Sequence, residues 1–160
     1  MIKYNDIKQR VNEYNSELQE KVDNTKSLNS IQDFSMQNIR KKTKDEQRSN
    51  LRIYKDEYKR IDRITESHIS RGVSDISRVF SNIGLNEDYV NLAEISHELH
   101  DIGRRPQYIE TGTTVDMESY NRELHQKRGV SLNLPNEIIN HATHGVYLLD
   151  DFLFDYLNIN

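Results

Sequence analysis

The fold of this 160-residue chain is decided by the stretch His97-Glu98-Leu99-His100-Asp101-Ile102-Gly103-Arg104-Arg105-Pro106. Histidine and aspartate side chains stand next to each other here, at the end of a mostly apolar helical pattern. Both side-chain types prefer water unless a partner satisfies them, and the usual partner that gathers imidazole and carboxylate groups is a divalent cation. The stretch therefore predicts a metal site at the end of a helix.

The helical pattern extends back to Asn86, and its projection at about 100° per residue places apolar residues on two sides. One side holds Val90, Ala93, His97, His100 and Asp101. The opposite side holds Leu92, Ile95, Leu99 and Ile102. A helix that is apolar on both sides is buried in the middle of a bundle. We therefore expect the histidines and Asp101 near the inner end of this helix, where unpaired charge is costly.

The rest of the chain also predicts helices. It contains only two prolines and six glycines, and its apolar residues do not keep up the alternation that strands require. We expect one helix from about Lys44 to Thr65 and another from about His68 to Ile83. Gly84 is the expected C-terminal stop of the second, and Asn86 is the expected N-cap of the helix that follows. The predicted fold class is all-α.

The C-terminal third of the chain combines a long connection with a final helix. We expect a loop from Arg104 to Leu134, with a short helix over Met117 to Gln126, and a last helix that opens at Pro135. This last helix carries apolar residues at helical spacing, namely Ile138, Ile139, Ala142, Val146, Leu148, Leu149, Phe152 and Leu153.

The first segment of the chain carries a thin apolar stripe on a long and otherwise polar helix, made of Ile7, Val11, Tyr14 and Leu18. The stripe is too narrow to bury this helix on all sides. We expect it to pack on one neighbouring surface, in this chain or in a second copy. A homo-oligomer is the favoured use, because symmetric pairing would extend the stripe. The predicted organisation is an N-terminal helical extension over residues 1–45 and a helical domain over residues 46–160.

Composition and charge narrow the classes of function. The formal net charge of −4 and the pI near 5.9 indicate no general attraction to nucleic acid. The sequence contains no cysteine, which excludes disulfides and thiolate chemistry. The start of the chain lacks the apolar core of a signal peptide, and no apolar run approaches the ~20 residues that span a bilayer. We therefore expect a soluble, cytoplasmic protein with no membrane partner.

Two motifs resemble those of a known family. His68, followed about thirty residues later by His100-Asp101, resembles the signature of the HD superfamily of metal-dependent phosphohydrolases. The run His144-Gly145-Val146-Tyr147-Leu148-Leu149 is similar to the His-Gly-Ala-Glu-Leu-Leu stretch common in HD domains. The resemblance covers about Ile61 to Phe154. It implies an HD-type helical bundle behind the N-terminal extension.

A finer resemblance points to one branch of this superfamily. The segment from His68 to Val90, with its Gly84-Leu85-Asn86-Glu87-Asp88 run, resembles the corresponding segment of deoxynucleotide triphosphate triphosphohydrolases. The run His100-Asp101-Ile102-Gly103, followed by Pro106, resembles the His-Asp-Leu-Gly-His-Thr-Pro run of the same enzymes. This branch implies a nucleotide as the substrate.

The resemblance implies a divalent-metal site with His68, His100 and Asp101 as ligands. Imidazole and carboxylate ligands suit Mn²⁺, Fe²⁺, Mg²⁺, Ni²⁺ or Zn²⁺, and the sequence does not choose among these ions. About three extra residues between Gly84 and His100, relative to the family, leave open a register in which His97 takes a ligand-like place.

Two residues late in the chain are further candidates for the site. The superfamily closes its metal site with a later aspartate, and Asp151 is the best internal candidate because it lies seven residues after His144, on nearly the same helix face. We favour a fourth ligand outside these 160 residues. His144, followed by Gly145, is expected to face the same cavity and to contact substrate phosphate or a second metal ion.

Three residues are candidates for catalysis beside the metal. Arg104 and Arg105 directly follow the ligands and could hold phosphate oxygens by forked hydrogen bonds. Arg104 and Gln107-Tyr108-Ile109 replace the His and Phe-Gly-His of the triphosphohydrolase pattern. His125 is therefore a candidate substitute for the extra catalytic histidine of that branch, as a general acid or base.

The expected function is metal-dependent hydrolysis of a phosphoester or phosphoanhydride, with a nucleotide or another phosphorylated small molecule as substrate. The alternative is a catalytically degenerate HD domain that binds a nucleotide or a protein partner. These two hypotheses differ in whether the chain releases phosphate.

Overall fold

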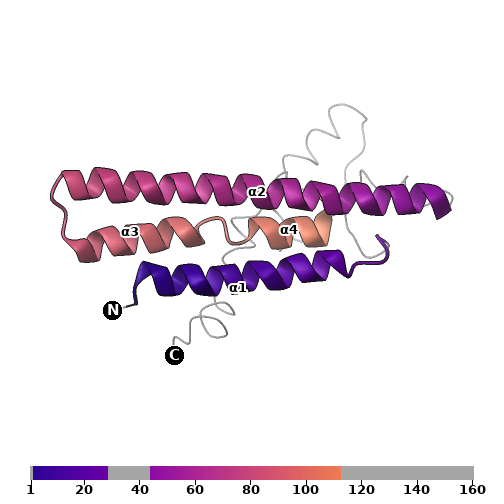
Figure 1. Cartoon of the computed structure of the whole chain (residues 1–160), viewed down its shortest axis with the longest axis horizontal. Helices are drawn as coiled ribbons and strands as arrows, with labels where there is room; N and C mark the ends of the chain where they lie inside the picture. The colour runs from indigo at the N-terminus through magenta and orange to yellow at the C-terminus, as the bar shows by residue number, and fades with distance from the viewer. Residues whose placement is uncertain (1, 29–43, 113–160) are drawn as a thin grey trace, which may run out of the picture.

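The computed structural model describes residues 2–28 and 44–112, which form four helices (Figure 1). Helix α1 spans Tyr4–Asp23, α2 spans Lys44–Asn82, α3 spans Glu87–Leu99 and α4 spans Arg104–Thr111. The described residues contain no strand, which confirms the all-α prediction. Within these ranges every helix is too short or too polar to cross a membrane.

Helix α2 is one continuous helix of 39 residues. The prediction of two helices, separated near residues 66 and 67, is wrong. No glycine or proline interrupts the chain there, and the buried stripe continues through the expected break with Ile61, Thr65 and Ile69. Helical spacing maintained on both sides of a point favours continuation, because each turn buries the next part of the same face.

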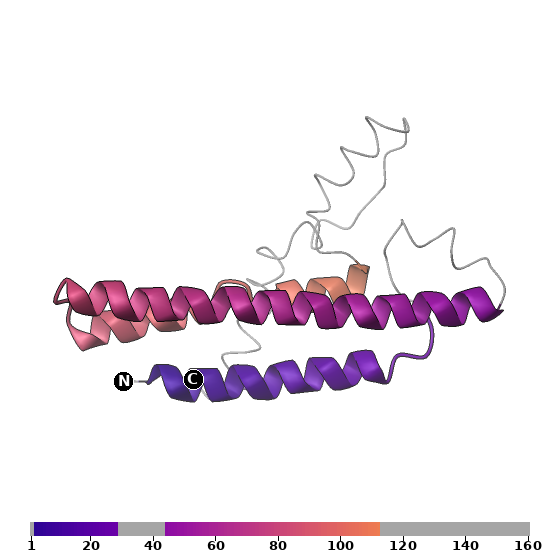
Figure 2. The same cartoon turned by 45° about the horizontal axis from the view of Figure 1, so that its top comes forward.

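The four helices run along a common long axis (Figures 1 and 2). Helices α3 and α4 follow one another along α2, and α1 lies alongside them; α1 contacts all three of the other helices. This arrangement brings the end of α3 and the start of α4 against the middle of α2. Residues far apart in the sequence therefore meet at the corner between α3 and α4.

The turn between α2 and α3 follows the sequence signals. Gly84 has a φ of +75°, the left-handed conformation that glycine adopts easily. The side chain of Asn86 caps α3, because its Oδ1 accepts a hydrogen bond of 2.8 Å from the backbone N–H of Asp88. Both boundary predictions are confirmed.

The start of the expected Arg104–Leu134 loop is helical instead. Helix α4 occupies Arg104–Thr111 and contains Pro106 in its first turn, where the missing backbone N–H would have no helical partner anyway. Gly112, with a φ of +74°, follows its end. Tyr108 and Ile109 of α4 are buried against α2 residues, so packing stabilises this short helix.

The core consists of two clusters. The larger one joins α1, α2 and α4 through Val22, Leu28, Tyr54, Tyr58, Ile61, Tyr108 and Ile109. The smaller one places Ile7 and Val11 of α1 against Ile102, with Tyr14, Ile95 and Leu99 packed around them.

The apolar stripe of α1 is thus covered by its own chain. Leu18 packs against the larger core cluster, and Ile7 and Val11 are buried in the smaller one. Of the two expected arrangements, packing within this chain and packing on a second copy, the structure shows the first. Symmetric pairing with a second copy, the favoured use, stays a prediction, because Ile7 and Val11 are already buried within the chain while Tyr14 and Leu18 are only partly buried against its core.

The expectation that α3 is buried on both sides holds for only part of its length. Ile95 and Leu99 pack against the α1 cluster, whereas Leu92 is 58% exposed. The reason is geometric, because α1 begins partway along α3 and covers its C-terminal part (Figure 1).

Candidate metal centre

Three predicted ligands, His68, His100 and Asp101, lie together at the corner between α3 and α4. His68 comes from the middle of α2, His100 is the C-cap of α3, and Asp101 lies in the turn that leads to α4. The His68 Nε2 atom lies 3.4 Å from His100 Nε2 and 3.6 Å from Asp101 Oδ2. His100 Nε2 lies 3.2 Å from Asp101 Oδ2. The structure therefore brings one atom of each side chain to a common point.

These three distances fit a shared divalent cation. Ligand atoms bound at ~2.0–2.2 Å with tetrahedral angles lie about 3.3–3.6 Å apart, and right angles bring them to about 3.0 Å. The pairwise distances of 3.2, 3.4 and 3.6 Å fall in this range. Two imidazoles and one carboxylate also form a donor set that first-row divalent metals accept. The residues present thus fit the implied metal, and their role as ligands remains a prediction.

A backbone contact prepares His100 for this role. Its Nδ1 atom lies against the carbonyl oxygen of His97, at hydrogen-bonding distance. A carbonyl oxygen only accepts, so this contact favours the tautomer of a neutral ring that carries its proton on Nδ1 and keeps a lone pair on Nε2. That lone pair faces His68 and Asp101. Such a second contact fixes both the tautomer and the ring orientation of a metal-binding histidine.

The corner that carries Asp101 is largely buried. The Asp101 side chain is only 10% exposed, whereas those of His68 and His100 are 49% and 41% exposed. The next residue, Ile102, is buried between Ile7 and Val11 of α1. Asp101 therefore lies at the inner wall of the site, and the histidines form its solvent-facing side.

A network of ion pairs crosses the bundle through residues just before His68 on α2. Lys8 Nζ of α1 lies 2.6 Å from Glu66 Oε1 and 2.8 Å from Glu98 Oε1 of α3. Arg105 Nε of α4 lies 2.6 Å from Asp62 Oδ1, and its Nη2 lies 3.5 Å from Glu66 Oε2. All four helices are therefore connected by charge.

The network changes the pKa of its members. Burial lowers the pKa of Lys8, but hydrogen bonds to Glu66 and Glu98 outweigh this effect and raise it above its usual 10.5. Burial raises the pKa of Glu66, but the Lys8 hydrogen bond and the nearby Arg105 charge outweigh it, so that the pKa lies below its usual 4.5. Both groups are therefore charged at neutral pH.

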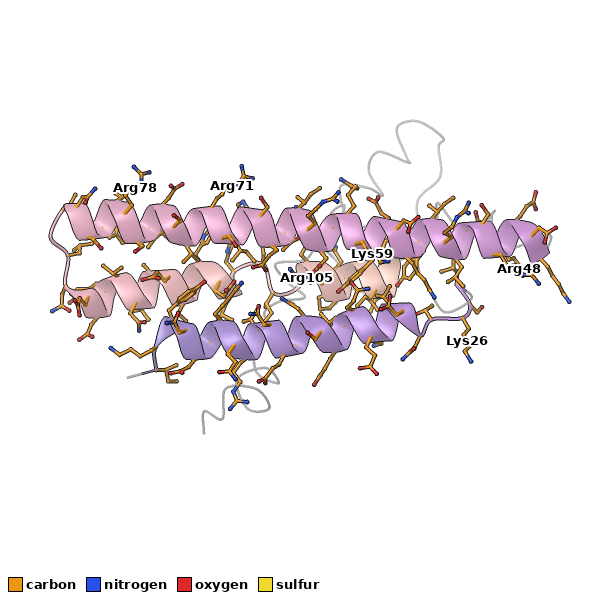
Figure 3. The ribbon with its side chains drawn as sticks, viewed as in Figure 1. Lys26, Arg48, Lys59, Arg71, Arg78 and Arg105 are labelled. Atoms are coloured by element: carbon orange, nitrogen blue, oxygen red, sulfur yellow. The ribbon has the colours of Figure 1, made fainter. Side chains whose placement is uncertain are left out.

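The two candidate arginines have different surroundings. Arg105 is buried, with its side chain 4% exposed, and its guanidinium is engaged by Asp62 and Glu66. Figure 3 shows it inside the bundle, whereas Arg71 and Arg78 project outward from α2. Holding a phosphate would require Arg105 to give up these contacts, and its expected phosphate role stays a prediction.

Arg104 is better placed to meet a ligand. With Arg60, Ile61, Ile64 and Thr65 it lines a small hollow of about 110 Å³. Thr65 is fully buried, and its Oγ1 has no hydrogen-bond partner in residues 2–28 and 44–112. Thr65 lies one turn before His68, and Arg104 lies three residues after Asp101, so both walls of the hollow adjoin ligand-bearing segments.

Three further candidate site residues, His125, His144 and Asp151, lie outside the described residues. Their roles as general acid or base, phosphate contact and fourth ligand remain predictions.

The charge network was missed at the level of sequence. Lys8 lies on α1 beside the buried Ile7, and the carboxylates of Asp62 and Glu66 lie one turn apart on α2, next to its apolar stripe. Charged residues at the edge of a buried stripe are the signal that could have revealed it. Their partners could not be assigned, because they lie on other helices.

Comparison with known proteins finds no match for this chain among protein-family models, curated proteins or solved structures. The resemblance to the HD superfamily accordingly remains a prediction.

Proposed function

We propose that this chain is an HD-type, metal-dependent phosphohydrolase domain that acts on a nucleotide or a related phosphoester or phosphoanhydride. The observation that supports this best is the group of His68 Nε2, His100 Nε2 and Asp101 Oδ2, which lie 3.2–3.6 Å from one another. Groups of histidine and acidic side chains also occur without metal, but here the backbone carbonyl of His97 contacts His100 Nδ1. This is the second contact that metal-binding histidines typically have.

The chemistry divides between the metal and the chain. When bound, a divalent cation lowers the pKa of water at the site and polarises a phosphoryl oxygen. His68 and His100 would hold the ion through Nε2, and Asp101 would supply negative charge from the buried side. The His97 carbonyl favours a proton on His100 Nδ1, away from the ligand atom.

The hollow beside Arg104 supports a phosphorylated substrate. Two arginines, Arg60 and Arg104, line it together with Thr65. Arg60 also pairs with Glu57, so Arg104 is the stronger candidate for a phosphate contact, and Thr65 could donate from its unpartnered Oγ1. Among the described residues no ion pair is recorded for the Arg104 guanidinium, which leaves its donors available.

One observation favours the alternative, a catalytically degenerate HD domain that binds a nucleotide or a protein partner. The ligand group among the described residues contains a single carboxylate, Asp101. One negative charge holds a divalent cation less firmly than two, so metal retention and turnover both depend on whether a further aspartate joins the site.

The test combines metal analysis with an activity assay. If Asp151 supplies the further carboxylate, we expect purified protein to bind Mn²⁺, Fe²⁺ or Zn²⁺ and to release phosphate from at least one member of a nucleotide panel. If that ligand lies outside these 160 residues, as favoured above, this chain should bind metal weakly and release little or no phosphate. His68→Gln and Asp101→Asn should each weaken metal binding about a hundredfold, whereas Asp75→Asn, which changes an exposed carboxylate on the same helix α2, should not.

The outcomes separate the two candidates. Metal binding that is lost in the ligand variants, without phosphate release, supports the degenerate domain. Metal binding that is unchanged in His68→Gln and Asp101→Asn contradicts both the ligand set and the proposed enzyme. Turnover abolished by Asp151→Asn would identify the further carboxylate within this chain.

A further inference from the structure

Gly72 of α2 lies directly against the imidazole ring of His97 on α3. A Cβ atom built on Gly72 would lie 1.8 Å from His97 Nε2, 2.4 Å from Cε1 and 2.6 Å from Cδ2. Atoms in ordinary van der Waals contact lie about 3.5–4.0 Å apart. Even an alanine at position 72 would therefore force the ring, or the whole of α3, to move by more than an ångström.

His97 also touches both histidines of the metal centre. Its ring centroid lies 4.5 Å from that of His100 and 5.6 Å from that of His68. Its backbone carbonyl faces His100 Nδ1. The missing side chain of Gly72 leaves a gap on α2, here called the Gly72 notch. The His97 ring lies between this notch and the two imidazoles that carry the ligand atoms.

His97 is not a ligand in this arrangement. Its side chain is not part of the group of ligand atoms that lie within 4.8 Å of one another. Its Nε2 is buried and has no hydrogen-bond partner in the described part of the chain, and it points at the backbone of α2 near Gly72. The register in which His97 takes a ligand-like place is therefore not the one adopted here.

We infer that His97 is a positioning residue and that the Gly72 notch, by admitting its ring, sets the separation of α2 and α3 at the metal centre. This inference rests on the proposed function. Ligand His68 belongs to α2, and ligands His100 and Asp101 follow α3, so the helix separation determines the distances between their ligand atoms. Metal–ligand distances tolerate only about ±0.2 Å, which is far less than the displacement that a Cβ at position 72 would cause.

The test is a double-mutant cycle with Gly72→Ala, His97→Ala and the combined variant. The first measurement is the melting temperature of the metal-free protein by circular dichroism. In the wild-type background Gly72→Ala should lower it, because the new methyl group collides with His97. In the His97→Ala background the same change should raise it, because alanine favours a helix interior more than glycine does once the collision is gone.

The second measurement follows the metal centre itself. Co²⁺ is titrated into each variant, and its visible absorption reports both affinity and coordination geometry. Gly72→Ala should weaken Co²⁺ binding by about tenfold or more and alter the spectrum. The combined variant should recover much of the loss relative to Gly72→Ala alone. Ser74→Ala, a change at an exposed small residue on the same helix, is the control and should match the wild type in both measurements.

Several results would overturn the inference. One is a Gly72→Ala protein that keeps both its melting temperature and its Co²⁺ affinity. Another is a lower melting temperature with unchanged Co²⁺ affinity and spectrum. That result would show that the Gly72 notch affects helix packing and does not position the metal ligands. If the wild-type protein binds no Co²⁺ although the reversal in melting temperature is present, the proposed metal site fails and the positioning role fails with it, while the packing contact stands.

Discussion

At the scale of single residues, buried tyrosines hold α4 against α2. The rings of Tyr54 and Tyr108 stack with centroids 5.1 Å apart. Their hydroxyls make reciprocal contacts, since Tyr54 Oη donates to the carbonyl of Ile109 at 3.2 Å and Tyr108 Oη donates to the carbonyl of Tyr54 at 3.0 Å. Each phenol therefore buries apolar area and also satisfies a backbone acceptor.

Burial of these phenols predicts alkaline unfolding. Burial raises the pKa of Tyr54 from 10.0 to about 12. Between these values the unfolded chain has lost a proton that the folded chain retains, so stability falls as pH rises through this window, and below pH 10.0 the group contributes nothing to the pH dependence. The free energy of unfolding should fall by at most about 1.4 kcal/mol per pH unit for this group.

Tyr54→Phe is the variant that isolates this effect. At neutral pH it should cost about 1 kcal/mol through the lost hydrogen bond, but its alkaline slope should be shallower than that of the wild type. Urea denaturation followed by circular dichroism at several pH values from about 7 to 11 measures both quantities. Parallel slopes in the two proteins would contradict the assignment.

At the scale of elements, the boundaries of α3 are set by different means. Its start depends on the cap at Asn86, a contact within two residues. Its end at Leu99 gives way to a turn in which Asp101 and Ile102 are buried, and α4 begins at Arg104. The end of α3 at Leu99 therefore coincides with packing, since Ile102 is buried against α1 in the turn that carries Asp101.

The cap at Asn86 predicts a measurable stability loss. Asn86→Ala should lower the free energy of unfolding by about 1 kcal/mol, because the backbone N–H of Asp88 loses its acceptor at the helix start. Ser96→Ala is the control within the same helix. Its hydroxyl only contacts the carbonyl of Leu92 one turn back, and alanine is the better helix former there. Equal losses for the two variants, measured by chemical denaturation, would argue against a cap.

At the scale of the whole molecule, one charge network connects all four helices. Glu98 is 1% exposed and accepts from Lys8 Nζ at 2.8 Å and from Tyr4 Oη at 3.1 Å. Its second oxygen has no hydrogen-bond partner among the described residues. The buried carboxylate therefore depends on α1 for its compensation, and α1 is held to the bundle by charge as well as by its apolar stripe.

Removing the ammonium group should be costly. Lys8→Met should lower the free energy of unfolding by about 2–3 kcal/mol, because it leaves Glu98 buried without its cation. Arg10→Met provides the matched comparison on the same helix, since Arg10 pairs with Glu13 on the exposed side at 3.3 Å. Its effect should stay within about 0.5 kcal/mol. Urea denaturation of both variants measures the difference, and similar effects would show that the network adds little.

Local signals in the sequence were sufficient to predict the fold class and one turn. The helical spacing of apolar residues predicted the all-α class, and the boundaries at Gly84 and Asn86 were predicted from residues that act within a few positions of themselves. The predicted break at the centre of α2 is absent, because the same spacing continues through it. The grouping of His68 with His100-Asp101 was proposed from a family resemblance, and the structure brings these side chains together.

The sequence by itself determined the helical class, the turn between α2 and α3, and the residue types available for a metal centre, because each of these depends on neighbours along the chain. Only the tertiary structure decided that α1 covers its stripe within the chain, that Arg105 is engaged by Asp62, 43 residues away, and that His97 fits against Gly72. These outcomes depend on which helix faces share space. Pattern along one helix shows that a face must be covered, but the covering partner is selected by packing and charge across the whole bundle.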